Sequence, residues 1–339
     1  MTNTPGTRIL IVAPSWIGDT VFAQPLFHLL HRHHQDLQLN VLAPPYLRPL
    51  LEHMPEVQSI IDNPFAHGDL RFGDRRRLGI MLRNRNFDQA IVLPNSLKSA
   101  LVPFLAKIPL RTGYVGEMRY GLLNDARRLE ESALTTMVER YAFLAESRGK
   151  SLTRPVPRPA LQVGSADLAA VLRKFGLDTN RHVTIFCPGA EYGPARRWPA
   201  AHYGALAKSI IGEGKQVWLL GSPKDREVAD QVQTASGGIC RNLAGETNLT
   251  EAIRLLAAAN VVVSNDTGLL HVASALNRPV VALYGSTAPG LAPPYSDRSA
   301  SVSLNLSCSP CRQRVCPLGH FNCMIRLTPE RVASAIDST

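Results

Sequence analysis

One stretch decides the fold: Val261-Val262-Val263-Ser264-Asn265-Asp266-Thr267-Gly268-Leu269-Leu270-His271. Its β-branched apolar residues are typical of a buried strand, and its small polar residues lead into a helical pattern that continues to Leu276. A strand followed at once by a helix presents unpaired backbone N–H groups at the helix start, where an anion can bind. The sequence therefore predicts a phosphate site here, bracketed by the carboxylate of Asp266 and the ring of His271.

Strands alternate with helices on both sides of this junction. Further buried strands are expected at 8–13, 37–43, 57–61, 87–93, 111–115, 182–187, 216–220 and 279–284. Helices are expected at 46–53, 96–107, 134–148, 166–174, 200–212, 224–234, 250–258 and 329–336, with another after the first strand. This alternation predicts an α/β protein with parallel, doubly wound sheets.

A proline-rich segment divides the chain. Three prolines at every second position make Ser151–Pro159 extended and stiff, as linkers often are. We therefore expect an N-terminal domain at 1–155 and a C-terminal domain at 160–339, with the final helix a candidate to pack back on the N-terminal domain. Each half begins with a strand, a Pro/Gly loop and a helix, which predicts two sheets facing across a ligand cleft at the carboxyl ends of their strands.

The composition favours acidic partners, which are nucleic acid, an anionic membrane face or phosphorylated substrates, and the alternative is a solubility charge spread over the surface. The 339 residues are 45% hydrophobic and carry a formal net charge of +10, and no apolar run is long enough to span a membrane. The start of the chain, Thr2 to Ile11, lacks the pattern of a signal peptide, so a cytoplasmic location is expected. Aromatic residues make up only 6% and common nucleic-acid-binding fingerprints are missing, which argues against nucleic acid.

Polar residues at three places follow predicted strands, and each place admits two interpretations. Asp19 either caps the first helix or acts as a general base at the carboxyl end of the first strand. Arg196 and Arg197 precede Pro199 at a helix start, where arginine is unfavourable unless an anion also binds, so a phosphate-binding role is favoured over a solvated charge pair. Asp225 either holds ribose hydroxyls or only favours the helix that it begins.

Four cysteines lie close together near the end of the chain: Cys308, Cys311, Cys316 and Cys323. Their number permits a structural zinc site, and C-x2-C is a common half-site. The second half, with six residues between its cysteines, is not a common knuckle. The sequence therefore favours free or redox-labile thiols over a metal site.

Several blocks of the sequence together resemble glycosyltransferase family 9, the heptosyltransferases of lipopolysaccharide core synthesis, over nearly the full length. The blocks are Ser15–Asp19, Gly113–Asp125, Met137–Tyr141, Pro188–Pro199, Asn242–Thr247 and Asn265–His271. The long blocks beginning at Gly113 and Pro188 are most similar to the branch that adds the second heptose.

The resemblance implies a GT-B fold, with two facing Rossmann-like domains, and an inverting transfer of L-glycero-D-manno-heptose from ADP-heptose. The N-terminal domain would hold an acceptor of the heptosyl-Kdo2-lipid A type, at the cytoplasmic face of the inner membrane, and the C-terminal domain the donor. Asp19 would be the catalytic base, and no cofactor would be required. The implied donor-binding residues are Asp266, Thr267, Gly268, Leu269, His271, Arg196, Asp225, Gly245 and Thr247. Arg196 stands where the family usually has lysine.

An arginine-rich segment from His67 to Arg85 is a candidate for the acidic lipid core and the membrane face. The acceptor-binding candidates are Arg71, Arg75 and Arg76, with neighbouring Arg77, and Arg119. The alternative for this segment is a solvated basic loop.

Other functions are kept as alternatives: another heptosyltransferase step of the same family, a nucleotide-sugar epimerase on the same two-domain plan, or a module that binds nucleotide or anionic lipid without catalysis. A Rossmann dehydrogenase is disfavoured because no G-x-G-x-x-G follows the first strand.

Overall fold

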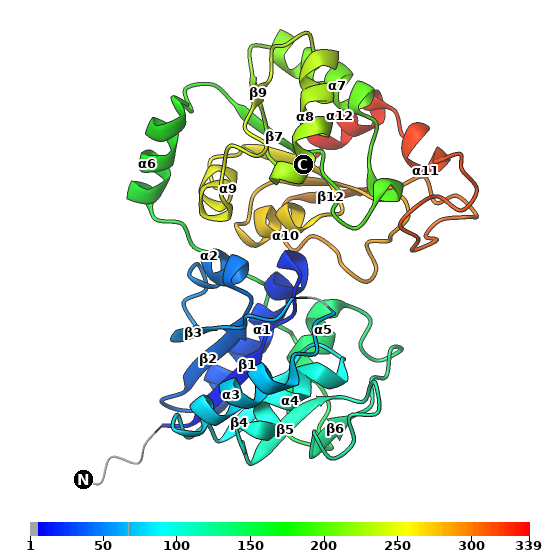
Figure 1. Ribbon diagram of the computed structural model, residues 1–339. Helices are drawn as coiled ribbons and strands as arrows, with labels where there is room; N and C mark the ends of the chain where they lie inside the picture. Colours follow the sequence, from blue (N-terminus) through cyan, green and yellow to red (C-terminus); the bar gives the residue numbers. More distant parts are fainter. Residues whose placement is uncertain (1–5, 67) are drawn as a thin grey trace. The chain divides into compact units, whose positions relative to one another are not determined.

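The computed structural model describes residues 6–66 and 68–339, so the expectations made for Thr2 to Pro5 and for His67 lie outside the described residues. The chain divides into two compact units, Met1–Pro159 and Ala160–Thr339 (Figure 1). Each unit is built on one six-stranded parallel sheet. The predicted doubly wound α/β architecture is confirmed.

The first unit has the strand order β3-β2-β1-β4-β5-β6. Its strands are β1 (Arg8–Val12), β2 (Gln38–Ala43), β3 (Ser59–Asp62), β4 (Gln89–Val92), β5 (Leu110–Tyr114) and β6 (Asp125–Arg127). Its helices are α1 (Ile17–His33), α2 (Arg48–Leu51), α3 (Phe72–Arg83), α4 (Leu97–Leu105) and α5 (Met137–Ala142), with 3-10 turns η1 (Pro45–Leu47) and η2 (Phe143–Ala145). Helix α1 packs on α5, and α3 packs on α4.

The second unit has the strand order β12-β11-β10-β7-β8-β9. Its strands are β7 (Val183–Cys187), β8 (Gln216–Leu219), β9 (Arg241–Asn242), β10 (Val261–Asn265), β11 (Val280–Leu283) and β12 (Ser299–Val302). Its helices are α6 (Ser165–Phe175), α7 (Ala200–Gly212), α8 (Arg226–Ala235), α9 (Leu249–Leu256), α10 (Gly268–Ala275), α11 (Asn322–Ile325) and α12 (Pro329–Asp337), with 3-10 turns η3 (Pro194–Arg196) and η4 (Pro223–Asp225).

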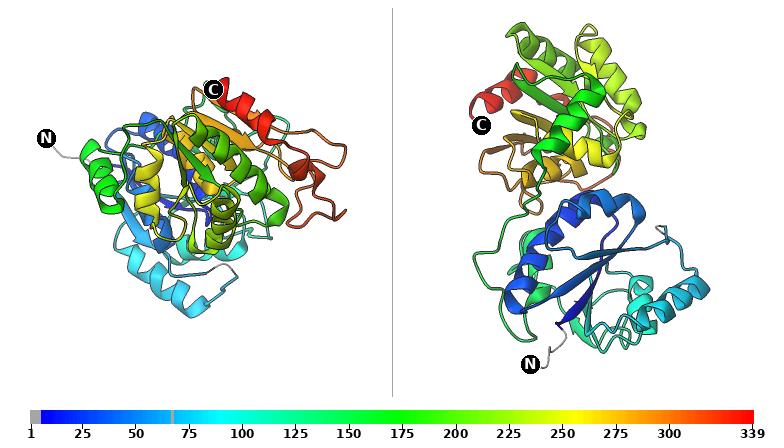
Figure 2. Two further views of the ribbon diagram at one scale, coloured as in Figure 1. Left: turned by 90° about the horizontal axis from the view of Figure 1, so that it is seen from above. Right: turned by 90° about the vertical axis from the view of Figure 1, so that its left-hand side faces the viewer.

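The central strands are apolar throughout because helices cover both faces of each sheet (Figure 2). In β1, Ile9, Leu10 and Ile11 are each 0% exposed. Leu10 and Val12 pack in one cluster with Leu78 and Leu82 of α3. Alternate residues of a strand point to opposite faces, so a run without polar interruption is what a doubly covered strand requires.

In both units the strand order reverses direction beside the first strand. The reversal lies between β1 and β4 in the first unit, and between β7 and β10 in the second. Ligands of open α/β sheets bind at the carboxyl ends of the strands at such a point. The first turn of α1, which follows β1, carries Asp19, the loop after β7 carries the Pro188 block, and the Asn265 block begins at the end of β10.

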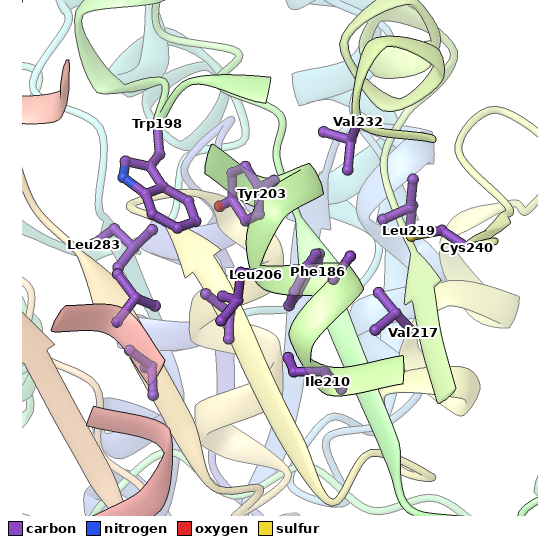
Figure 3. Close-up of a cluster of buried hydrophobic side chains, with 14 of the residues drawn as sticks. Phe186, Trp198, Tyr203, Leu206, Ile210, Val217, Leu219, Val232, Cys240 and Leu283 are labelled. Atoms are coloured by element: carbon purple, nitrogen blue, oxygen red, sulfur yellow. The ribbon is translucent and has the colours of Figure 1, made fainter. Parts of the chain in front are cut away.

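The second unit has an aromatic core beneath its site loops. Phe186, Trp198 and Tyr203 are each 0% exposed, and the Trp198 and Tyr203 rings meet edge to face at 4.7 Å (Figure 3). The indole Nε1 of Trp198 donates to the carbonyl of Leu327 at 2.7 Å. The Trp-Pro pair that follows the arginines is therefore an anchor in the core.

Some elements differ from those expected. The helix predicted at 134–148 is confined to α5 and η2, and the arginine-rich segment forms helix α3. Strands β6, β9 and β12 were missed because they are short and carry polar residues at the sheet edges. The last helix, α12, packs within the second unit on α7, β11 and β12 through buried Val332. None of the helices within residues 6–66 and 68–339 has the length and apolarity needed to cross a bilayer.

The contact between α7 and α8 gives a test of the core. A Cβ added at Gly204 of α7 would lie 2.5 Å from the Cβ of Ala235, whereas one added at Gly212 of the same helix meets nothing within 4 Å. We expect Gly204→Ala to lower the free energy of unfolding by about 1–3 kcal/mol through overpacking. Gly212→Ala should leave it unchanged or raise it by up to about 1 kcal/mol. Urea unfolding followed by circular dichroism measures both, and equal midpoints would contradict this packing.

Candidate functional site

The junction between β10 and α10 is the centre of the candidate site. Asn265 ends the strand, and Thr267 precedes helix α10 with extended backbone and no side-chain hydrogen bond to cap it. The helix therefore begins at Gly268 with its first N–H groups uncapped by a side chain. Ser264 lies beneath, 0% exposed, and its Oγ donates to the carbonyl of Asn265 at 2.7 Å. The anion-ready helix start expected from the sequence is present.

The Asn265 side chain ties this junction to the loop after β7. Its Nδ2 donates to the carbonyls of Pro188 and Gly189, at 2.8 and 3.2 Å. Its Oδ1 accepts from the backbone N–H of Trp198 and from the hydroxyl of Tyr203, both at 3.1 Å. The amide is 0% exposed, so all four contacts are made away from water. Asn265 thus sets the spacing between the two loops.

Asp266 lies at the centre of a buried charge cluster. One carboxylate oxygen is 3.0 Å from Nη1 of Arg196, and the other is 3.3 Å from Nε2 of His271. Burial opposes ionisation, but the hydrogen bond to His271 and the charge of Arg196 overcome it and hold the pKa of Asp266 below its ordinary value. Asp266 is only 7% exposed and is held as a carboxylate.

Arg196 is oriented on two sides. Its guanidinium lies 4.3 Å from the ring centroid of Tyr192, and Nη1 also donates to the carbonyl of Asp266 at 3.2 Å. Its Nε is buried and has no hydrogen-bond partner within residues 6–66 and 68–339. A fixed guanidinium with an unused donor next to an uncapped helix start is suited to bind a phosphate group.

The other residues of the second unit expected to bind the ADP-heptose donor differ in their contacts. The Asp225 carboxylate accepts from the backbone N–H and the hydroxyl of Ser222, at 2.9 and 2.7 Å, so it caps the turn before α8. It also packs on Gly189, where an added Cβ would meet Asp225 Oδ1 at 2.3 Å. Gly245 has φ +74° and donates its N–H to the carbonyl of Gly221. The Oγ1 of Thr247 is buried without a partner in the described part of the chain.

Asp19 in the first unit does not cap helix α1. The helix begins at Ile17 with Trp16 before it, which places Asp19 in the first turn, partly exposed. The physical reason is that the Trp16 carbonyl already accepts the N–H of Thr20, so the helix starts before Asp19. Burial and the nearby charge of Asp19 raise the pKa of Tyr141, which places this carboxylate close to α5.

Two arginines expected to contact the acceptor are buried instead. Arg75 is 4% exposed and donates to the carbonyls of Asp69, Leu70 and Lys98. Arg119 is 2% exposed and donates to backbone carbonyls that include those of Pro94 and Tyr114, and burial lowers its pKa to about 10. Both side chains hold loops together because unpaired carbonyls there need donors.

The other two arginines lie on the surface. Arg71 pairs with Asp74 at 2.7 Å, and Arg76 is exposed on α3.

Residues that the sequence did not single out also belong to the site. Asn265 lies within a quoted motif, but the sequence does not show that its side chain joins two loops. No sequence pattern identifies Tyr192, because its contact with Arg196 depends on how its loop folds.

The comparisons with known proteins point to one family. The model of the family described as Glycosyltransferase family 9 (heptosyltransferase) matches residues 75–322. Lipopolysaccharide heptosyltransferase 2 of Salmonella typhimurium is 46% identical over 340 residues, covering 98% of each chain. Lipooligosaccharide heptosyltransferase 2 of Haemophilus influenzae is 45% identical over 308 residues, covering 88% of each. The structure of E. coli ADP-heptose LPS heptosyltransferase II matches with a TM-score of 0.89 at 44% identity, covering 98% of each chain.

Two parallel, doubly wound units with this likeness define a glycosyltransferase of the GT-B fold. The chain belongs to glycosyltransferase family 9.

The Asp266 cluster predicts a pH dependence of stability. Because its pKa is lower in the folded state than the ordinary 3.8, Asp266 stabilises the fold above that pH. This stabilisation is lost as the pH falls through the depressed pKa. The difference in unfolding free energy between wild type and Asp266→Asn should be constant from about pH 7 to 5 and shrink below about pH 4.

Urea titrations at several pH values give this difference. Asp337→Asn, on an exposed position of α12, is the control because it removes a carboxylate outside any buried cluster. If the difference for Asp266→Asn did not change between pH 5 and 3, the buried carboxylate would not be part of the stabilising cluster.

Proposed function

We propose that this chain is an inverting heptosyltransferase that moves L-glycero-D-manno-heptose from ADP-heptose onto the first heptose of a lipopolysaccharide inner core. The likeness to lipopolysaccharide heptosyltransferase 2, 46% identity over 98% of the chain, carries the choice of donor and step. The acceptor would be of the heptosyl-Kdo2-lipid A type, and the proposal includes no cofactor.

The second unit would hold the donor. The diphosphate would lie at the start of α10, with Thr267, Gly268 and Leu269 supplying backbone N–H groups. Arg196 would add a positive charge, and these groups together would stabilise the ADP leaving group as negative charge develops on it. Asp266 would hold heptose hydroxyls while its charge is balanced by Arg196 and His271.

Further contacts of the donor are proposed for the loops beside β8. The buried Oγ1 of Thr247 has an open hydrogen-bonding capacity that a ligand hydroxyl would fill. Gly245 turns this loop at positive φ. Asp225 has a structural use through Ser222, so its proposed contact with ribose would involve the same carboxylate in two roles.

The first unit would hold the acceptor, with Asp19 as general base. Asp19 would accept the proton of an acceptor heptose hydroxyl while that oxygen attacks the anomeric carbon of the donor. The bond from this carbon to the ADP oxygen breaks, and positive charge builds on the sugar as in glycosyl transfer generally. A partly exposed carboxylate in the first turn of α1 is accessible for this role.

The function is tested by mass spectrometry of a monoheptosylated core acceptor after incubation with ADP-heptose. We expect one added heptose per acceptor and release of ADP. Transfer only to an acceptor without heptose would assign another step of the family. Release of a free, epimerised sugar would indicate an epimerase, and binding without donor consumption would indicate a non-catalytic module.

Removal of the proposed base gives a second test. Asp19→Asn should lower kcat by about 10²–10⁴-fold, because a general base contributes a factor of this size. Its affinity for ADP, measured by calorimetry, should stay within about twofold of wild type, since the donor site lies in the other unit. Asp69→Asn in the same unit is the control. Near-normal turnover of Asp19→Asn would exclude it as the base.

We further propose that the outward side of α3 contacts the anionic surface of a bilayer. Phe72, Arg76 and Ile80 follow one another at intervals of four residues, with Met81 beside them, and all four are exposed. A helix face that combines arginine with apolar side chains suits the membrane interface. Arg71 lies next to it, whereas Arg75 and Arg119 would support the acceptor site only indirectly, by holding its loops.

Vesicle flotation tests this surface. Binding to vesicles with about 30% anionic lipid should weaken with added salt, and the double variant Arg76→Ala/Met81→Ser should weaken it by about fivefold or more. Lys208→Ala, an exposed cation on α7 of the second unit, is the control. Salt-insensitive binding, or equal binding by the α3 variant, would contradict the proposed contact.

A further inference from the structure

The segment between β12 and α12 is held by few regular elements. From Ser303 to Thr328 the backbone forms only the short helix α11. Three of its non-glycine residues, Asn305, Arg312 and Phe321, have φ of +48°, +57° and +48°. Such conformations cost about 1 kcal/mol or more each and persist only where the surroundings enforce them. A cross-link in this segment would help to enforce these conformations.

The four clustered cysteines meet inside this segment. Cys308, Cys311, Cys316 and Cys323 are free thiols that line one pocket. Ser286, at the end of the loop after β11, lines the same pocket; it is 1% exposed, and its Oγ has no hydrogen-bond partner in the described ranges 6–66 and 68–339. The pocket thus combines four thiol sulfurs, which are soft metal ligands, with the buried hydroxyl oxygen of Ser286, whose hydrogen-bonding capacity is unused.

Backbone dipoles also favour negative charge in this pocket. The backbone N–H groups of Phe321, Leu318, His320 and Gly319 are directed at the thiol of Cys316. The N–H···S arrangement stabilises a thiolate, the form that binds metals. The backbone around Cys316 therefore favours a thiolate over a neutral thiol.

The charges of the segment match a tetrathiolate. Between Ser303 and Thr328 the sequence has Arg312, Arg314 and Arg326 and no Asp or Glu. Four thiolates around one divalent cation carry a net charge of −2, which these arginines would offset. The same surroundings are ill-suited to a site of carboxylate ligands.

We propose that Cys308, Cys311, Cys316 and Cys323 bind one thiophilic divalent metal ion, of the zinc or ferrous type, as a structural tetrathiolate site. On binding, four S–H groups release four protons and form four bonds from sulfur to the metal, with no change of oxidation state. Within residues 6–66 and 68–339, no three His, Cys, Asp or Glu side chains are already arranged to hold a metal ion. On binding, the thiols would therefore turn toward the pocket that they line.

The metal would brace the donor loop. The carbonyl of Arg314 accepts the N–H of Ala195 at 3.1 Å, and the carbonyl of Arg312 accepts the hydroxyl of Tyr192 at 3.2 Å. Tyr192 thus has the guanidinium of Arg314 at 5.1 Å and that of Arg196 at 4.3 Å from its ring centroid. Fixing the cysteine segment would fix Tyr192 and, through it, Arg196.

Elemental analysis of the full-length chain tests the site directly. Protein purified under reducing conditions, without metal-affinity resin or chelator, should contain about one equivalent of zinc or iron. Cys308→Ser and Cys316→Ser should each lower that content at least tenfold, and Cys240→Ala, which removes a buried thiol outside the pocket, should not. Should the cysteine variants fail to fold, release of the metal from wild type by a thiol-blocking mercurial gives the same stoichiometry.

Three results would overturn the proposal. The first is less than one-tenth equivalent of metal both as purified and after incubation with ZnCl₂ and desalting. The second is free reaction of all four thiols with a thiol reagent in protein so treated. The third is a mass lowered by two hydrogens per pair of cysteines, which would show disulfides instead.

The bracing role rests on the proposed function and has its own readout. Removal of the metal should weaken ADP binding by about tenfold while the metal content is measured on the same sample. Equal ADP affinity with and without metal would overturn the bracing role. Because metal content does not depend on catalysis, failure of heptose transfer and failure of the metal site give different results.

Discussion

The amide of Asn265 is the contact on which the second unit depends. It is fully buried, and it joins the end of β10 to the loop after β7 and to the start of α7 through four hydrogen bonds. Only an amide has two donors and a carbonyl acceptor in this shape, so a carboxylate or an apolar side chain would leave buried groups unpaired. The position of Asp266, one residue further on, and that of Arg196 follow from it.

Much of this arrangement is visible in the sequence. The apolar runs of the central strands and the Pro/Gly loops predict both sheets, and the junction at residues 261–271 predicts a helix start suited to an anion. Periodicity fails where burial is partial, which explains why β9 and β12 were missed. It also cannot distinguish a solvated arginine from a buried one. Arg75 and Arg119 are buried because several carbonyls converge on each, and no local pattern records that convergence.

Charge is used in two different ways in the two units. In the first, buried guanidinium groups replace secondary structure as partners for backbone carbonyls and so hold irregular loops. In the second, Arg196 is balanced by Asp266 and oriented by an aromatic ring, with one donor left over. The net charge of +10 is therefore not a single basic surface, and composition alone overstates how much positive charge faces a ligand.

The strand pairing of the second unit has a consequence for folding. Asn265 bonds to Pro188 across a separation of 77 residues, and the chain between them forms β8, β9 and their helices. Contacts between such distant residues are slow to form because the loop between them must close first. We therefore expect the loops that Asn265 joins to become ordered only after the chain from Pro188 to Asn265 has been synthesised.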